Sequence, residues 1–459
     1  MSDLKKTIVW TVLGVSICTL LVPLITETRG MQTYLNLASF LLIYAAGVVL
    51  LTLLISLVRR DLFRPISNYW APILISSKTM IAFMIGFGLY WYDFSVARSH
   101  SYFSDYAYTY TLPTIRTDGW WIGEAASEGI SQQRLKTIVE RFVNDPDFKW
   151  QHSFVLIKNN RVIVEEYFYE HTIDSLHDLR SANKSITSIL VGIAIQQGFF
   201  TSVKDPIAMY LPEYADIFKS DPPKATITLE HLLTMQSGLD ANDWDKRSPG
   251  NENRLYQSGE DWVRQLFSLK LINKPGQQFS YSSIGEIALR QAIVNASGMP
   301  LDEFAKVYLF EHLGIKNYKW THRLEGRPDV PYRIQLTSRD LGKLGQLYLD
   351  MGSWEGRQIV SPDWVIRSTD THTKTTEKRL GFPNYGYLWW KHGFKVGDVL
   401  FESFQAQGSG GQFLFVIPEL NTIAVFTSRN FGRSRQINPL KIMRNEIVPM
   451  LAKHLVDHS

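Results

Sequence analysis

The sequence predicts an α/β (α+β) protein in which an antiparallel sheet is flanked by helices and carries an inserted helical subdomain, preceded by N-terminal transmembrane helices. Three observations lead to this prediction. Long apolar runs precede the large domain, strand-like hairpins open and close that domain, and most segments between the hairpins read as helical. With 459 residues, 45% of them hydrophobic, the chain is long enough for one large domain and a smaller module.

The N-terminal region reads as a membrane module. Residues 8–25 and 34–58 are apolar runs without charged residues, and each is long enough to cross about 30 Å of hydrocarbon. A third, shorter run at residues 79–95 contains Trp91, which suits a membrane interface. A cleaved signal peptide is the alternative for the first run, but two further runs and the lack of a small-residue cleavage signature disfavour it.

Positive residues predict the orientation of these segments. Lys5 and Lys6 precede the first run, and Arg59 and Arg60 follow the second. The positive-inside rule therefore places the N-terminus and the loop after the second run in the cytoplasm. Three spans then give a multi-pass protein of the inner (cytoplasmic) membrane whose catalytic domain is periplasmic or extracytoplasmic. If the third segment does not cross, that domain is cytoplasmic.

The predicted organisation is a membrane module at residues 1–97, a connector at 98–118 and one large domain at 119–459. The domain opens with a helix at 131–143 and a hairpin at 153–169, whose turn falls on two asparagines that tolerate positive φ. A second hairpin spans 412–427. Helices are expected at 283–296 and 301–313, and this order predicts one sheet built from both ends of the domain.

One short motif carries the clearest chemistry. Ser181 precedes Lys184 by three residues at the start of a largely apolar stretch that ends near Gly198, so the two side chains share one face of a helix. A serine hydroxyl becomes a nucleophile when a nearby base takes its proton. A lysine is such a base if burial lowers its pKa.

Each element of this interpretation has a simpler alternative. The same spacing occurs at Ser2 and Lys5, where it carries no chemistry, and Lys184 at a partly exposed helix end would merely reach water. Trp389 and Trp390 are predicted to pack in the core.

Later segments complete a recognisable set. Residues 275–285 contain Tyr281, residues 406–413 contain a glycine cluster, and residues 232–239, 336–341 and 385–390 flank them. Together with Ser181 and Lys184, in this order, they resemble the serine β-lactamase class C and esterase family of penicillin-recognising enzymes. The resemblance covers roughly residue 119 to the C-terminus and implies the β-lactamase/transpeptidase-like fold, with the active site between sheet and helices.

The resemblance also implies roles for particular residues. Ser181 is the nucleophile that forms an acyl-enzyme, with Lys184 and Tyr281 as acid–base partners that titrate as a coupled pair. The backbone N–H groups of Ser181 and Ser409 form the oxyanion hole. The positions implied in substrate binding are Ser283, Gln407, Gly408 and Gly410.

Two positions depart from the antibiotic-hydrolysing members. Ser283 stands where the family's Y-x-N motif has asparagine, and Ala406 stands where a lysine or histidine opens the K-T-G or H-x-G motif. A cation there would bind a substrate carboxylate. Its absence favours a neutral, small-molecule ester or amide over a β-lactam or a peptide ending in D-alanine.

Composition excludes several other classes. The net charge of +4 and scattered basic residues give no nucleic-acid signature. Cys18 is the single cysteine, and the sequence contains no H-E-x-x-H and no metal-spaced Cys/His cluster, so neither a metal nor a cofactor is predicted. The expected partners are the ester or amide substrate and the membrane lipid bilayer, and the oligomeric state stays open.

The leading hypothesis is therefore a membrane-anchored serine hydrolase. The alternatives are a D,D-peptidase or β-lactamase acting on cell-wall-like substrates, and a pseudoenzyme that binds a ligand and signals or scaffolds. A transport component is a further alternative, which the uncharged apolar runs disfavour.

Overall fold

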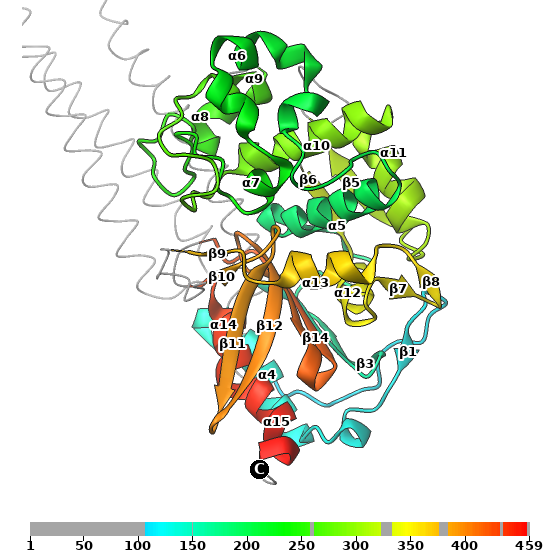
Figure 1. The fold of residues 1–459 in the computed structure, drawn as a ribbon. Helices are drawn as coiled ribbons and strands as arrows, with labels where there is room; N and C mark the ends of the chain where they lie inside the picture. Colours follow the sequence, from blue (N-terminus) through cyan, green and yellow to red (C-terminus); the bar gives the residue numbers. More distant parts are fainter. Residues whose placement is uncertain are drawn as a thin grey trace, which may run out of the picture. The chain divides into compact units, whose positions relative to one another are not determined.

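The computed structural model of the protein describes residues 106–148, 150–257, 261–322, 333–375, 384–431 and 435–456. Within these residues, strands from both ends of the domain join in one large sheet (Figure 1). Its pairs are antiparallel except for β1 against β3, which run parallel. In spatial order the strands are β1 (Trp121–Ile122), β3 (Arg161–Tyr167), β2 (Gln151–Lys158), β14 (Thr422–Ser428), β13 (Gln412–Ile417), β12 (Val399–Gly408), β11 (Trp390–Val396), β10 (Asn384–Tyr385) and β9 (Thr373–Lys374).

Both predicted hairpins are present, and they meet at the centre of the sheet. Asn159 and Asn160 have φ of 50° and 59° and make the tight turn between β2 and β3. The second hairpin joins β13 to β14 through a short helical turn at Pro418–Leu420. Because β14 pairs with β2, the first and last parts of the domain close into one sheet, as the sequence predicts.

Helices cover both faces of this sheet. On one face, Phe142 of α4 (Gln132–Asn144) packs against Phe154 and Phe426, which are partners in the β2–β14 register. On the other face, α12 (Ser338–Leu349) brings Gly342 and Gly345 down onto the sheet, where only a hydrogen in place of a side chain fits close to Ile157 and Ile423. The sheet is therefore the middle layer of the domain.

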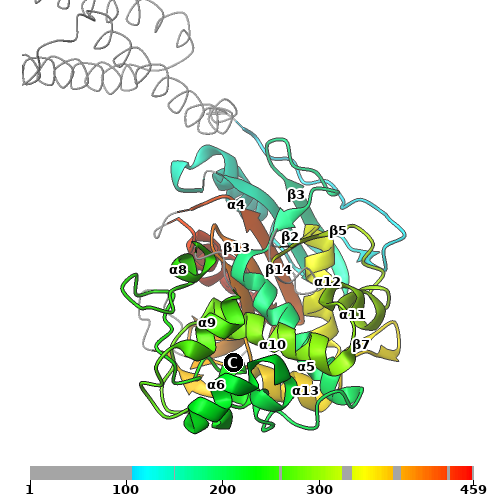
Figure 2. The same cartoon turned by 90° about the horizontal axis from the view of Figure 1, so that it is seen from above.

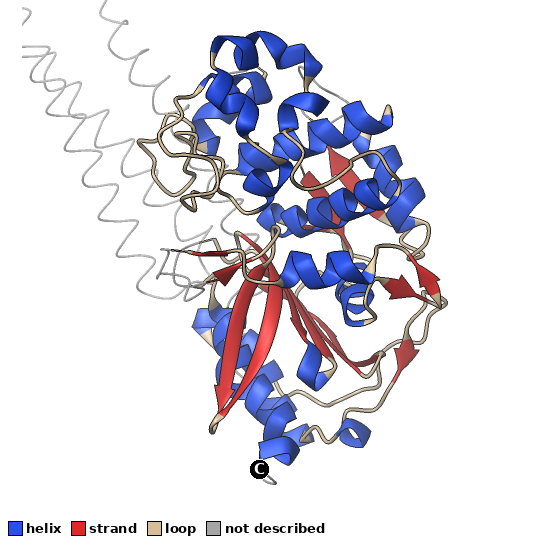
Figure 3. Ribbon diagram, viewed as in Figure 1, coloured by secondary structure: helices blue, strands red, loops and turns tan. Residues whose placement is uncertain are grey.

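The inserted region is mainly helical, as predicted, and lies at one end of the sheet (Figure 3). Its central pair, α5 (Asn183–Gln196) and α10 (Ser283–Ser297), lie side by side in both views (Figures 1 and 2). The helices around them are α6 (Ala215–Ser220), α7 (Leu229–Leu233), α8 (Glu252–Gln257), α9 (Trp262–Ser268) and α11 (Leu301–Ala305).

The remaining elements connect the two parts or finish the chain. The predicted helix at 301–313 is shorter than expected, because α11 passes into a π-helical segment at Lys306–Phe310. Two small sheets were not predicted: β4 (His177–Asp178), β6 (Arg333–Leu336) and β5 (Tyr318–Thr321) form one, and β7 (Ser353–Trp354) and β8 (Arg357–Gln358) form the other. The other helices are α13 (Pro362–Thr369), α14 (Asn438–Ile442) and α15 (Val448–Val456).

The predicted localisation is corrected by the structure. Among the described residues, no helix is long and apolar enough to cross a membrane, which contradicts the multi-pass location with an extracytoplasmic catalytic domain. The segments on which that prediction rested, residues 8–25, 34–58 and 79–95, lie outside the described residues.

A close contact between α5 and α13 generates a stability prediction. A Cβ added at Gly192 would lie 2.5 Å from the indole ring of Trp364, which is fully buried. We expect Gly192→Ala to lower the free energy of unfolding by about 1–3 kcal/mol, the usual cost of overpacking a core. Urea unfolding followed by circular dichroism measures the change.

Gly285 on α10 is the matched control, because a Cβ there meets nothing closer than 3.4 Å. Alanine at Gly285 should leave stability unchanged or raise it by up to about 1 kcal/mol through helix propensity. Equal stability of the two variants would contradict the packing described for α5.

Candidate active site

The predicted nucleophile lies in a constrained turn at the entrance to α5. Ser181 belongs to a 3₁₀ turn, Arg180–Ala182, that runs directly into the helix. The preceding Arg180 has φ of 51°, a left-handed conformation that is uncommon for a residue with a side chain. Asp178 stabilises this conformation by accepting bonds from the backbone N and the Nε of Arg180, at 3.0 and 3.1 Å. Strain of this kind is typical of functional turns.

Lys184 lies one turn further on and is buried, with 4% of its surface exposed. Its Nζ donates to Ser283 Oγ at 3.0 Å and to Ser181 Oγ at 3.4 Å. The same nitrogen lies 5.1 Å from the centre of the Tyr281 ring. The alternative in which Lys184 merely reaches water from a helix end is therefore wrong, and the predicted trio of Ser181, Lys184 and Tyr281 lies together.

The charge state of Lys184 differs from the sequence-based expectation. Burial does lower its pKa, but the ionised form of Tyr281 and the carboxylates of Glu286, Glu252 and Asp243 outweigh burial, and the net pKa is raised. The raised pKa favours the ammonium form of Lys184. This cation favours ionisation of a neighbouring phenol, so the arrangement suits a pair in which Tyr281 accepts the proton and Lys184 supplies the positive charge.

Tyr281 is fixed in place by aromatic packing and by the backbone. Its ring stacks on Trp244, with centroids 5.0 Å apart and planes 7° apart, and also packs near Trp390 at 5.9 Å. The pKa of the Tyr281 hydroxyl is raised overall, because burial outweighs the lowering effects of Lys184 and of a hydrogen bond with Ser181. Trp389 and Trp390 are themselves buried, so the prediction that they pack in the core is confirmed.

Sequence reasoning missed Asp243, which contacts the segment that carries Tyr281 and Ser283. Its carboxylate accepts a bond from the backbone N of Ser283 at 2.6 Å and from that of Glu252 at 2.9 Å. Its own backbone N donates to the Tyr281 carbonyl at 2.9 Å. Burial, with Glu252 nearby, raises the pKa of Asp243 to about 6. Asp243 thus ties together the two segments that carry Tyr281 and Ser283.

A second buried carboxylate was also missed, one turn along α10. Glu286 accepts hydrogen bonds from Thr187 of α5 and from Arg290, and all three side chains are buried. This cluster joins α5 to α10 immediately below Lys184. Its location explains why the two helices hold their relative position, which sets the distance between Ser181 and Ser283.

The glycine cluster begins at the end of β12, beside the turn that holds Ser181. A Cβ on Gly408 would lie 2.2 Å from the Leu179 carbonyl oxygen and 3.1 Å from Arg180 Cβ, so the close approach made possible by this glycine is to the chain just before Ser181. Ser409 follows Gly408 and is exposed. These contacts bring the end of β12 beside the turn that holds Ser181.

The remaining predicted positions have different surroundings. Gly410 has φ of 90° and packs against Phe431, whose ring also lies under the Arg180 guanidinium at 5.1 Å. Gln407 is buried, and its side-chain amide donates to Gln405 along β12 rather than towards Ser181. Ala406 is buried within the same strand. Gln407 is therefore a predicted substrate-binding residue whose side chain instead contacts a residue of its own strand.

Comparison with protein families gives one match. The family model described as "Beta-lactamase" matches residues 152–443, which is more than half of the chain and includes every residue of the group around Ser181.

Individual relatives are distant but cover much of the chain. An uncharacterised protein of Alkalihalophilus pseudofirmus is 26% identical over 64% of this chain and 88% of its own. The 6-aminohexanoate-dimer hydrolase of Paenarthrobacter ureafaciens is 24% identical over 60% of this chain and 71% of its own. Among solved structures, a putative 6-aminohexanoate-dimer hydrolase from Bacillus anthracis superposes with a TM-score of 0.57 at 19% identity, covering 79% of this chain and 95% of that one.

The raised pKa of Asp243 generates a prediction about pH-dependent stability. Because its pKa rises from 3.8 to about 6 on folding, folding favours the protonated carboxyl, and this contribution is lost as the pH increases through about 6. Asp243→Asn removes the ionisation. Between about pH 4.5 and 7, we expect the wild type to lose about 2 kcal/mol of stability relative to the variant.

Urea unfolding of both proteins across this pH range measures the difference. The comparison cancels the titration of every other group that the two chains share. Stabilities that run parallel with pH would contradict the largely enclosed environment of the Asp243 carboxylate beside Glu252.

Proposed function

Since this chain belongs to the beta-lactamase family of serine hydrolases, we propose that it cleaves neutral ester or amide bonds through an acyl-enzyme on Ser181. One observation carries the proposal above all others. The buried Lys184 ammonium lies between the hydroxyls of Ser181 and Ser283 and beside the ring of Tyr281. A cation in this place assists proton removal from a hydroxyl nucleophile without any histidine.

The proposed reaction has two halves. In the first, Ser181 Oγ attacks the substrate carbonyl carbon while its proton passes to Tyr281, whose ionised form Lys184 stabilises. The bond to the leaving alcohol or amine then breaks, and that group departs with the proton from Tyr281. In the second half, water attacks the acyl-enzyme and gives its proton to Tyr281, which passes it to Ser181 Oγ as the bond to the acyl group breaks and the acid is released.

Stabilisation of the oxyanion is assigned to backbone donors. The proposed groups are the N–H of Ser181 and the N–H of Ser409, as the family resemblance implies. The contact of Gly408 with the Leu179 carbonyl supports this assignment, because it places the residue before Ser409 against the residues before Ser181. A bulkier residue at position 408 would move the two donors apart.

The substrate class follows from the charges near the nucleophile. The position of the family's carboxylate-binding cation is Ala406, a buried residue of β12. Arg180, the residue next to Ser181 in the sequence, is ion-paired with Asp178 at 3.1 Å. Neither Ala406 nor Arg180 therefore offers a free positive charge to a substrate carboxylate. This favours an uncharged ester or amide as the substrate.

The proposal is tested first at Lys184. We expect Lys184→Met to abolish turnover of short-chain p-nitrophenyl esters and anilides, because the proton-accepting pair loses its cation. A circular dichroism spectrum that matches the wild type shows that the fold is retained. Near-normal activity of the folded variant would contradict the assignment of Lys184.

A second prediction concerns the Tyr281 hydroxyl. Tyr281→Phe keeps the ring that stacks on Trp244 but removes the group that relays the proton, so we expect kcat to fall by about 10²- to 10⁴-fold with little change in KM. The matched control is Tyr385→Phe, another buried tyrosine that packs on Trp390. Equal losses of kcat in the two variants would indicate that only packing had been disturbed.

A further inference from the structure

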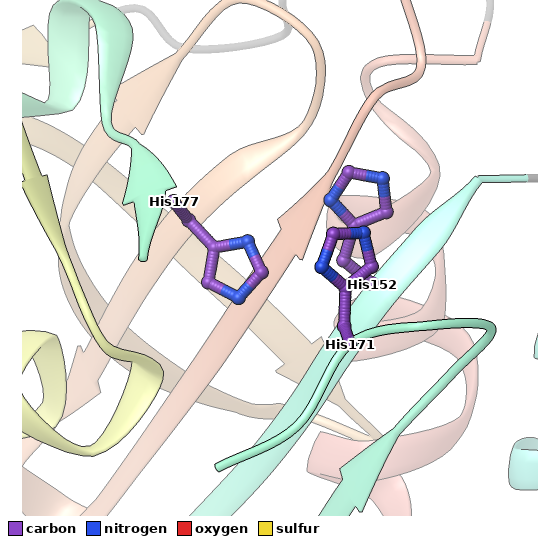
Figure 4. A group of neighbouring side chains, drawn as sticks. All are labelled: His152, His171 and His177. Atoms are coloured by element: carbon purple, nitrogen blue, oxygen red, sulfur yellow. The ribbon is translucent and has the colours of Figure 1, made fainter. Parts of the chain in front are cut away.

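Away from the nucleophile, three histidines converge from separate parts of the fold. His152 lies on β2, His171 in the loop after β3, and His177 on β4. One ring nitrogen from each lies within 4.8 Å of the others. Figure 4 shows the ring of His177 pointing towards the other two rings, which overlap. The ring centroids are 3.8 Å apart for His152 and His171, 5.2 Å for His171 and His177, and 5.6 Å for His152 and His177.

The cluster contains an unsatisfied nitrogen. His177 is buried, with 4% of its surface exposed, and its Nε2 has no hydrogen-bond partner among the described residues. A buried polar atom without a partner costs free energy, and in native proteins such an atom calls for an explanation such as a bound ion or water. One ring nitrogen of His177 also lies within 4.8 Å of a nitrogen of His152 and of His171, so a single ion can bind all three rings.

We propose that His152, His171 and His177 form a binding site for a divalent transition metal, Zn²⁺ in the first instance. Imidazole nitrogens are common zinc ligands. Three histidines can bind a tetrahedral zinc ion whose fourth position is taken by water or another group. The proposal concerns a site separate from the proposed hydrolytic chemistry, which needs no metal.

Burial disfavours a proton on each of the three rings. Burial lowers the pKa of His152 to about 2 and that of His177 to about 3, and it also lowers the pKa of His171. His171 and His177 further lower the pKa of His152, and His171 further lowers that of His177, since like charges repel.

The distances require only small side-chain movements. A tetrahedral zinc with Zn–N bonds of about 2.0–2.1 Å places its ligand atoms about 3.3 Å apart. The three nitrogens lie within 4.8 Å of one another and the His152 and His171 rings are 3.8 Å apart at their centroids, so binding requires these rings to rotate until their nitrogens converge.

The fourth ligand is a water or Glu170. The Glu170 carboxylate lies 3.9 Å from His171 Nε2. A negative ligand there also offsets the positive charge of Arg429, which is near enough to lower the pKa of His152. These two groups are the charged neighbours that a bound ion would meet.

The position of the cluster gives the metal a structural role. His177 precedes Asp178, and Asp178 holds the strained Arg180 immediately before Ser181. A metal that joins His177 to β2 and to the loop after β3 would brace the start of the nucleophile turn. We therefore expect bound zinc to raise the melting temperature without being required for the acylation of Ser181.

The test is direct metal binding by the purified full chain after treatment with EDTA and buffer exchange. Titration with Zn²⁺ against a chromogenic chelator should give about one ion per chain. Replacement by Co²⁺ should give visible absorption bands of a nitrogen-ligated, near-tetrahedral site. His152→Gln, His171→Gln and His177→Gln should each weaken Zn²⁺ binding by at least about tenfold, a conservative value for the loss of a ligand.

His312→Gln is the matched control, because His312 lies outside the cluster and should leave binding unchanged. Wild-type binding well below one ion per chain, or cluster variants that bind zinc as tightly as the wild type, would overturn the proposal and indicate an adventitious ion only. If the variants do not fold, the stoichiometry and the Co²⁺ spectrum of the wild type still decide the question.

Discussion

The arrangement around Ser181 depends on one buried positive charge. Lys184 is removed from water, and a buried cation is costly unless hydrogen bonds and opposite charges compensate for it. Here two hydroxyls accept its hydrogen bonds, while Glu286, Glu252 and Asp243 supply negative charge around it. The carboxylates therefore act electrostatically as well as structurally. They raise the pKa of Lys184, and the positive charge of Lys184 in turn lowers the pKa of Tyr281 against the effect of burial.

The fold brings together the segments that meet at this charge. α5 supplies Ser181 and Lys184, and α10 begins at Ser283. Asp243 joins the segment before α8 to Tyr281 through its backbone and to Ser283 through its side chain. From the sheet side, Gly408 at the end of β12 packs against the Leu179 carbonyl. The helical region and the sheet thus both contact the short stretch that carries Ser181.

Local patterns predicted much of the fold and part of the site. Two short apolar runs on either side of the asparagines at 159–160 specify a hairpin, and the Ser181–Lys184 spacing specifies a shared helix face. Asp243, Trp244 and the three histidines gave no such pattern, because they reach their partners only through pairing of distant segments. The pKa of Lys184 was expected to fall on the basis of burial alone, since the surrounding carboxylates are distant in sequence. The localisation relied on apolar runs that lie outside the described residues.

The central claim is that Ser181 is an activated nucleophile, and covalent labelling tests it most directly. The purified protein and Ser181→Ala would be treated with a fluorophosphonate, and mass spectrometry would locate the adduct. The arrangement of Ser181, Lys184 and Tyr281 predicts one adduct, on Ser181, that the variant lacks. A folded wild-type protein that forms no adduct would contradict the account and favour a ligand-binding protein without hydrolytic activity.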